Sequence, residues 1–126
     1  MPITYTFDPP GQRVILVLSG LITDRDLFSA YEALYSDPEH RVGMDELADC
    51  RAVERLDVTT GGLVSLAAAT ARLLDGHAQT WRVAIVAPAD VVFGTARMYE
   101  SFRAESPEQV QVFRDRREAE EWLGRG

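Results

Sequence analysis

Two adjacent threonines, Thr59 and Thr60, are the side chains with the clearest potential for chemistry. They stand at the start of a stretch that has helical periodicity and carries no charge until Arg72. The first backbone N–H groups of a helix lack intrahelical partners, and the helix dipole favours negative charge beside them. Thr59, Thr60 and the following Gly61 are therefore candidates for receiving a phosphoryl group or binding an anion. The alternative is that a threonine only caps the helix, which contributes about 1 kcal/mol.

Arg97 is the candidate cation for such a site. It lies in the helical segment after Pro88, and in a parallel sheet this segment begins at the same edge as Thr59. Ligands of open α/β sheets bind at that edge, where a guanidinium can pair with a phosphate or carboxylate. The alternative is a solvated arginine in a surface ion pair of little net energy.

Cys50, followed by Arg51, invites comparison with cysteine phosphatases, in which a thiolate attacks a phosphate held by a loop that ends in arginine. The arginine of that loop would fall at position 56, which is Leu56, so the spacing excludes this chemistry. We expect Cys50 to be a buried residue at a strand end. His40 and His77 are isolated, with no metal-ligand spacing and no Ser-His-Asp arrangement. The sequence predicts no catalytic residues, no metal and no cofactor.

The close carboxylate pairs, Asp24 with Asp26 and Asp45 with Glu46, are the remaining groups that acid–base chemistry would need. An Asp beside a helix start is favoured by the helix dipole, and a charge in a loop is favoured by water. We therefore expect both pairs to be helix-start or loop charges rather than a catalytic set.

The composition favours one globular domain that spans residues 1–126. With 126 residues, 46% of them hydrophobic, the chain can bury a core without a metal or a disulfide. No apolar run approaches the roughly 20 residues of a membrane span. The net charge of −7 opposes binding to nucleic acid or anionic lipid. A lone cysteine, and an N-terminus with neither a basic nor an apolar region, predict a cytoplasmic protein.

The elements that position these residues begin with a hairpin. Alternation of apolar residues and threonine predicts a half-buried strand at 3–7. Residues 8–11, Asp-Pro-Pro-Gly, predict a turn because proline fixes φ and glycine permits reversal. The continuous apolar run at 14–18 predicts a strand covered on both faces, which Gly20 ends.

Strand and helix patterns then alternate. A helix is predicted from Thr23 or Asp24 as N-cap to a stop at Asp37-Pro38. The other expected elements are a strand at 44–50 followed by a polar loop, a helix at 60–74 closed by Gly76, a strand at 81–87, a helix capped by Asp90, a strand at 110–113, and a terminal helix that begins at Asp115. The order β-β-α-β-α-β-α-β-α predicts an α/β domain with a mainly parallel five-stranded sheet, an N-terminal hairpin and about four helices.

The predicted helix at 60–74 carries apolar residues on more than one face. A stripe that begins with Leu63 would pack on the sheet, whereas Ala68, Ala69 and Thr70 lie partly around the other side. A solvated helix usually carries charge there. Leu63, Ala68, Ala69 and Thr70 are therefore the expected partner or ligand face. A homodimer contact, a partner protein, the wall of a lipid pocket, or cover by other helices would each explain it.

The strand-loop-helix segment around Thr59 resembles the STAS domain of bacterial anti-sigma-factor antagonists, which has the SpoIIAA-like fold. In that family a strand ends in Asp, a loop carries a buried Val, and Asp-Ser-Ser-Gly opens a helix whose second Ser is phosphorylated. Here Asp49 ends the strand, Val53 lies in the loop, and Asp57-Val58-Thr59-Thr60 stands in place of Asp-Ser-Ser-Gly. The resemblance implies a phospho-acceptor position at Thr59, in a degenerate motif with Val58 in place of the first Ser.

The C-terminal part is similar to a divergent STAS-like group that is often placed with the lipid-binding SEC14 superfold. The similarity is carried by A-I-V-A-P-A-D-V-V-F-G-T-A-R-M-Y at 84–99 and by V-F-R-D-R-R-E-A-E-E-W-L at 112–123. It implies a single STAS-like domain over nearly the whole chain.

Three functions follow as alternatives. The first is a non-enzymatic STAS-like regulatory module that offers the helix at 60–74 to a protein partner or second subunit, and whose docking a phosphate on Thr59 would weaken. The second is a carrier of a small amphiphile or lipid, with an acyl chain under the helix and its head group near Arg97. The third is an enzyme of unknown type, placed last because no catalytic set is recognised.

Overall fold

A five-stranded sheet and four helices make up the part of the chain that the computed structural model describes, residues 2–8, 13–77 and 79–124. The strands are β1 (Ile3–Asp8), β2 (Arg13–Thr23), β3 (Asp45–Asp57), β4 (Trp81–Val86) and β5 (Glu108–Phe113). The helices are α1 (Asp24–Tyr35), α2 (Thr60–Leu74), α3 (Asp90–Phe102) and α4 (Arg116–Gly124). This order confirms the predicted α/β arrangement. Residues 9–11 of the predicted turn lie outside the described residues.

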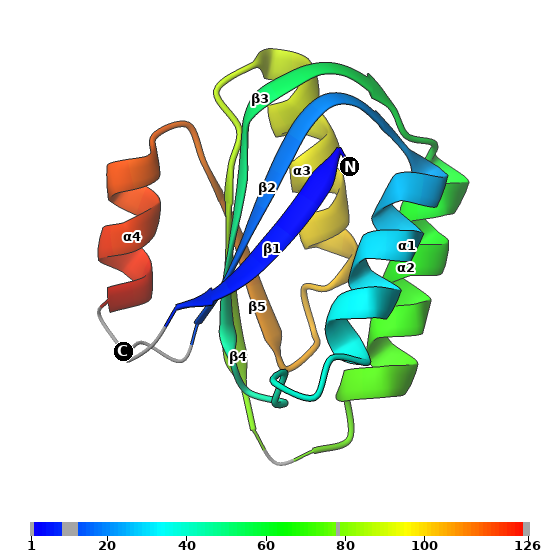
Figure 1. Ribbon diagram of the computed structural model, residues 1–126, viewed down its shortest axis with the longest axis vertical. Helices are drawn as coiled ribbons and strands as arrows, with labels where there is room; N and C mark the ends of the chain where they lie inside the picture. Colours follow the sequence, from blue (N-terminus) through cyan, green and yellow to red (C-terminus); the bar gives the residue numbers. More distant parts are fainter. Residues whose placement is uncertain (1, 9–12, 78, 125–126) are drawn as a thin grey trace.

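The strands follow one another across the sheet in the order β1-β2-β3-β4-β5. β1 pairs antiparallel with β2, and the other neighbours are parallel, so the sheet is mixed and mainly parallel. Right-handed crossovers that always step in the same direction place their helices on one face. Figure 1 accordingly shows α1, α2 and α3 on one side of the sheet and α4 on the other. None of the described helices is long and apolar enough to span a bilayer.

Two hydrophobic layers enclose the sheet. On the side of α1–α3, Val14 and Leu34 are fully buried. On the other side, Leu47 packs in a cluster with Leu123 of α4, as the apolar face of the predicted terminal helix requires. Because β3 is covered on both faces, the adjacent Leu47 and Ala48 are both buried although their side chains point in opposite directions.

β2 and β3 are longer than the sequence indicates. Gly20 was predicted to end β2, but it adopts φ +68° beside an irregularity in the β2–β3 pairing, and the strand continues to Thr23. Residues 51–57, predicted as a polar loop, pair with the end of β2 and extend β3 to Asp57. Most of these side chains are exposed, so the segment has the polar sequence that is typical of a loop. Its strand structure comes from backbone hydrogen bonds to β2. The two strands form a ribbon that leads into α1 and α2 (Figure 1).

The N-cap of α1 is one of the two residues that the sequence predicted, whereas the N-cap of α3 is not the predicted residue. Thr23 caps α1: its hydroxyl accepts from the Asp26 N–H at 3.2 Å, and the Asp26 carboxylate accepts from the Thr23 N–H at 2.9 Å. This pair forms a capping box. Asp90 was predicted to cap α3, but the N-cap is Ala89, and Asp90 pairs with Arg114 at 2.6 Å. A carboxylate in the first helical turn still suits the dipole.

Candidate functional site

The start of α2, which we call the α2 mouth, is built from Thr59, Thr60, Gly61 and Gly62. Thr59 is the N-cap, and its hydroxyl accepts a hydrogen bond from the Gly62 N–H at 2.9 Å. This bond satisfies one of the free donors of the first turn. The α2 mouth is exposed at Thr59 and Thr60. Thr59 therefore caps α2, which was the alternative to a phosphate or anion site. The hydroxyl oxygen that caps the helix is also the atom that a phosphate would be attached to.

The carboxylate of Asp24 already occupies the α2 mouth. Its Oδ1 accepts from the Thr59 N–H at 2.9 Å, and its Oδ2 accepts from the Thr59 hydroxyl at 2.6 Å. The positive end of the α2 dipole favours a negative group here. The sequence predicted Asp24 only as a charge at the start of its own helix. The contact joins residues 35 positions apart, and no local pattern indicates it.

Gly62 is required by this contact. A Cβ built on Gly62 would overlap the Asp24 carboxylate, whereas a Cβ on Gly61 would meet only the Thr59 hydroxyl at 3.9 Å. The glycine that comes later than in the Asp-Ser-Ser-Gly motif therefore has a packing role in this chain. Only glycine allows the carboxylate to approach the first turn so closely.

Arg97 does not lie at the α2 mouth, contrary to the sequence-based expectation. Its side chain is 58% exposed and pairs with Glu100 on the same helix at 3.6 Å. No hydrogen bond joins it to Thr59 or Thr60 in the part of the chain that the structure describes. The α3 side chain that contacts the mouth through a hydrogen bond among the described residues is Met98, whose sulfur lies 3.7 Å from the Thr60 hydroxyl. An anion at Thr59 would thus meet backbone N–H groups and Asp24, and not this arginine.

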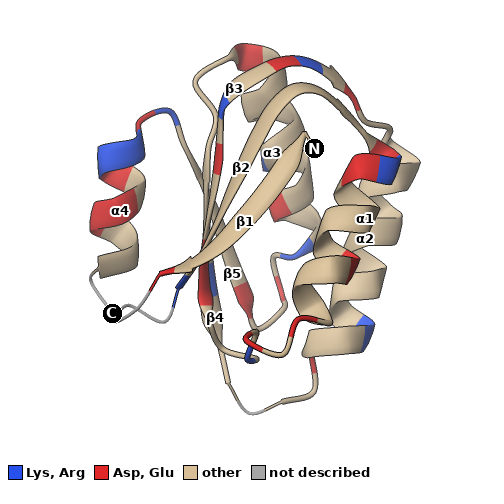
Figure 2. Ribbon diagram, in the orientation of Figure 1, with Lys and Arg blue, Asp and Glu red and all other residues tan. Residues whose placement is uncertain are grey.

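Of the four residues predicted to form the partner face of α2, two are buried and two are at least partly accessible. Leu63 is buried and Thr70 is only 1% exposed, so these two cannot contact a docked partner; Ala68 is exposed and Ala69 half-buried. Thr70 was wrongly placed on an outer face because packing by neighbouring helices covers that side of α2. Figure 2 shows α2 without charge as far as Arg72.

An exposed apolar surface lies instead between α2 and α3. It is formed by Val64, Ala68, Met98 and Phe102, and we call it the α2–α3 surface. Val64 is 48% exposed and Phe102 is 40% exposed. With Ala68 they line one shallow hollow of about 330 Å³. The sequence indicated an uncharged α2 but not that α3 supplies the other half of this surface.

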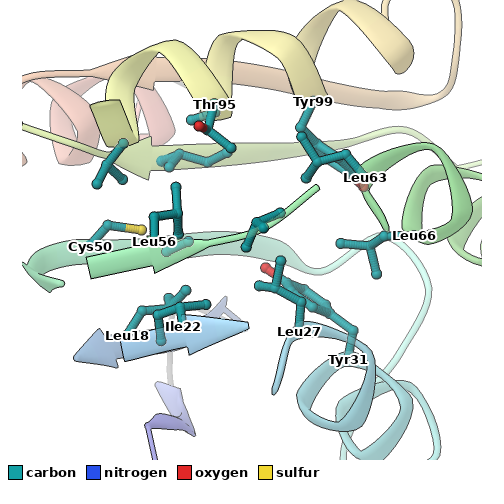
Figure 3. Close-up of a pocket in the computed structure, with 15 residues that line it drawn as sticks. Leu18, Ile22, Leu27, Tyr31, Cys50, Leu56, Leu63, Leu66, Thr95 and Tyr99 are labelled. Carbon is teal, nitrogen blue, oxygen red and sulfur yellow. The ribbon is translucent and has the colours of Figure 1, made fainter. Parts of the chain in front are cut away.

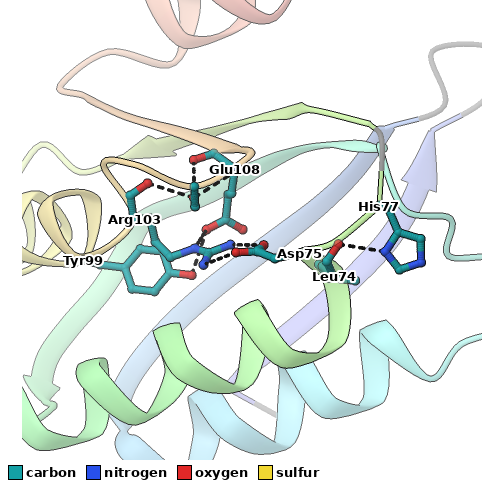
Figure 4. A network of polar contacts seen from close by, with 7 residues as sticks. Leu74, Asp75, His77, Tyr99, Arg103 and Glu108 are labelled. Carbon is teal, nitrogen blue, oxygen red and sulfur yellow. Dashed lines mark hydrogen bonds and ion pairs between the residues drawn. The ribbon is translucent and has the colours of Figure 1, made fainter.

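The far end of α2 is held by charged groups. Arg103 is buried and donates to Asp75 at 2.8 Å and to Glu108 at 2.9 Å, and the Tyr99 hydroxyl donates to Glu108 at 2.9 Å (Figure 4). Asp75 is the C-cap of α2, and Gly76 follows it with φ +94°. A buried carboxylate needs such partners. The cluster ties α2, α3 and β5 together.

Glu46 is a second buried carboxyl group and has no such pairing. It is 2% exposed, and its Oε1 has no hydrogen-bond partner among the described residues. Burial, and after it the charge of Glu108, raises the pKa of Glu46 well above its ordinary value. The sequence predicted the pair of Asp45 and Glu46 as loop charges at an uncertain strand start, but β3 includes both residues and the Glu46 side chain lies in the core.

Cys50 is buried, as predicted. Burial, and after it the charge of Asp49, raises the pKa of its thiol to about 12, so the thiol stays protonated and is a poor nucleophile. The described residues contain no group of three or more His, Cys, Asp or Glu side chains arranged to hold a metal ion.

An apolar cavity of about 80 Å³ lies between α1–α3 and the sheet (Figure 3). Leu63 and Leu66 of α2 line it together with Cys50 of β3 and side chains of α1 and α3. Arg97 is not among its lining residues.

Comparison with known proteins identifies the fold. No family model and no curated protein matches this sequence. Among solved structures, the chain is similar to an uncharacterised protein of the DUF3478 family with a SpoIIAA-like fold from Shewanella loihica PV-4. The two share 17% identity over 96% of this chain and 93% of the other, with a TM-score of 0.62. The chain therefore has the SpoIIAA-like fold of STAS domains, as the sequence predicted.

The first prediction concerns the α2 mouth. Replacing Gly62→Ala will lower the free energy of unfolding by about 1–3 kcal/mol, because the added Cβ displaces Asp24 from its hydrogen bonds with Thr59. The matched variant Gly61→Ala will leave stability unchanged or raise it by up to about 1 kcal/mol, because its Cβ has room and alanine favours helix. Urea unfolding measures both. Equal stability of the two variants would contradict the role assigned to Gly62.

The second prediction concerns Glu46. Since its pKa is raised in the folded state, the folded protein keeps a proton that the unfolded chain releases above about pH 4.3, so this residue lowers stability as pH rises. The variant Glu46→Gln will therefore gain stability relative to the wild type between about pH 4 and pH 8. The exposed Glu105→Gln is the control and should show no such trend. Urea midpoints across this pH range provide the measurement, and parallel curves for wild type and Glu46→Gln would refute the assignment.

Proposed function

We propose that the protein is a non-enzymatic STAS-like regulatory module that docks a protein partner or a second subunit through the α2–α3 surface. The observation that carries this proposal is the exposure of Val64, Met98 and Phe102 beside the small side chain of Ala68. Contiguous exposed apolar surface is typical of interaction sites, and aromatic and methionine side chains are enriched in them.

The scarcity of free charge around the α2–α3 surface favours a partner whose contacting face is apolar. The chain carries a net charge of −7, yet α2 has no charge before Arg72. Arg103, which borders the hollow, is buried and already paired with Asp75 and Glu108. A partner docked here meets little charge that it would have to desolvate.

The α2 mouth offers a place for regulation of docking. Thr60 in the mouth contacts Met98 of the α2–α3 surface, so the two sites adjoin. A phosphate on Thr59 would add about −2 of charge where Asp24 already lies 2.6 Å from the hydroxyl. Repulsion would separate Asp24 from Thr59 and place charge beside the docking surface. Docking would weaken through both effects.

The amphiphile carrier receives less support. Pockets for drug-sized ligands have volumes of about 300–1,000 Å³, and the cavity under α2 has about 80 Å³, too little for an acyl chain. The head-group role given to Arg97 also fails, because Arg97 lines neither the cavity nor the α2 mouth.

The third prediction tests the docking surface. A photo-cross-linker placed at Ala68 in the full chain, expressed in its own host, will identify the partner or a second copy of this chain. With that partner purified, Val64→Glu will weaken binding at least about tenfold, because a charge is buried against an apolar face. Leu73→Glu is the matched control: Leu73 is also apolar and 54% exposed on α2 but lines a groove toward α1. Equal binding of the two variants would overturn the proposal.

The fourth prediction tests the regulation alone. Thr59→Glu, which brings a carboxylate against Asp24, will reduce partner affinity measured by isothermal titration, whereas Thr59→Ser, which keeps the capping oxygen, will not. Full affinity of Thr59→Glu would refute the switch and leave the docking module standing.

A further inference from the structure

The apolar cavity is lined by side chains of the sheet and of the helices α1, α2 and α3. Leu18 and Ile22 of β2 lie on one side of it, Thr95 and Tyr99 of α3 on the opposite side, and Leu63 and Leu66 of α2 at one end (Figure 3). None of its lining residues is charged. An ionised ligand would therefore lose its hydration without gaining a partner.

Tyr31 is the lining residue whose hydroxyl proton has no acceptor among the described residues. The Tyr99 hydroxyl donates to Glu108 at 2.9 Å, and the Thr95 hydroxyl donates to the Val91 carbonyl oxygen at 2.9 Å. The Tyr31 ring extends from α1 to the cavity, and no hydrogen bond of its hydroxyl occurs within residues 2–8, 13–77 and 79–124. Burial raises the pKa of Tyr31 well above its ordinary value, so the hydroxyl remains a neutral donor. Tyr31 is half-buried and its hydroxyl oxygen is accessible, so the hydroxyl can donate to a molecule in the cavity.

A surface groove adjoins the cavity. A groove of about 410 Å³ lies between the extended end of β3 and the start of α3. It shares Leu56 and Val92 with the cavity wall, so the two spaces adjoin.

We propose that this cavity binds a small, uncharged, mostly hydrocarbon molecule whose single oxygen atom accepts a hydrogen bond from Tyr31. The volume of about 80 Å³ is roughly half of the 150 Å³ cavity that holds benzene, so only a few heavy atoms fit. An ordered water needs about two to four polar partners, and apart from the hydroxyls of Tyr31, Thr95 and Tyr99 and the Cys50 thiol the lining side chains are hydrocarbon, which favours a mostly apolar occupant. This site is separate from the α2–α3 surface and does not depend on the proposed docking function.

Three probes of similar size test the site on the intact protein by amide chemical shifts. 2-Butanone has an uncharged carbonyl oxygen, propionate has the same number of heavy atoms but a charge, and xenon has no hydrogen-bonding atom. We expect 2-butanone and xenon to shift amides around Cys50 and Ala96 in a saturable way and propionate not to do so. Propionate binding as tight as that of 2-butanone, or no saturable shift with any probe, would overturn the proposal.

Two tyrosine variants separate the hydrogen bond from the cavity. Tyr31→Phe should weaken 2-butanone binding about two- to tenfold and leave xenon binding unchanged, because only one hydrogen bond is lost. Tyr35→Phe is the matched control on the same helix, since Tyr35 does not line the cavity, and it should bind both probes as the wild type does. Unchanged 2-butanone affinity in Tyr31→Phe would refute the assigned donor.

A cavity-filling variant tests the location. Ala96→Leu places extra side-chain volume in the cavity and should abolish binding of both 2-butanone and xenon. Retained binding in folded Ala96→Leu would place the probes elsewhere and overturn the proposal. If this variant does not fold, the comparison of Tyr31→Phe with Tyr35→Phe still decides.

Discussion

The structure depends on the pairing of β2 with β3 along their full lengths. The register runs from Arg13 opposite Asp45 to Thr23 opposite Asp57. Both strands therefore end side by side, and the helices that follow them start side by side. This is why Asp24, the first residue of α1, reaches Thr59 at the start of α2. A shift of the register would separate the carboxylate from Gly62, whose missing side chain leaves room for it.

The same pairing, together with crossovers that step in one direction, makes α2 the middle helix of its layer. Polar contacts hold both of its ends, through a carboxylate at the start and an arginine at the end. Asp24 supplies negative charge at its start, and the Arg103 cluster holds Asp75 at its end. Between these ends α2 carries no charge before Arg72, so one side packs on the core and the side toward α3 stays apolar and exposed. The α2–α3 surface is thus a consequence of where α2 lies.

Similarity to a SpoIIAA-like structure at 17% identity establishes the fold, and function must be argued from the sites. The degenerate motif at the α2 mouth illustrates the difference. The resemblance implies a phospho-acceptor at Thr59, and the structure shows this residue as the N-cap of α2. Gly62 is explained by the close approach of Asp24. The cavity beneath α2 is a further property of this chain's own side chains, above all Tyr31.

The sequence by itself determined the order of elements, the bounds of α2 and the burial of Cys50, because periodicity is a local property. It also restricted each cap to two neighbouring residues, Thr23 or Asp24 for α1 and Thr59 or Thr60 for α2, of which the structure uses Thr23 and Thr59. The tertiary structure alone decided the extension of β2 and β3, since that pairing is made by backbone groups whatever the side chains are. It also decided the contact of Asp24 with Thr59, the burial of Glu46 and Thr70, and the separation of Arg97 from the α2 mouth. Each of these depends on which distant segments become neighbours, and strand register and crossover direction set that only when the whole sheet has formed.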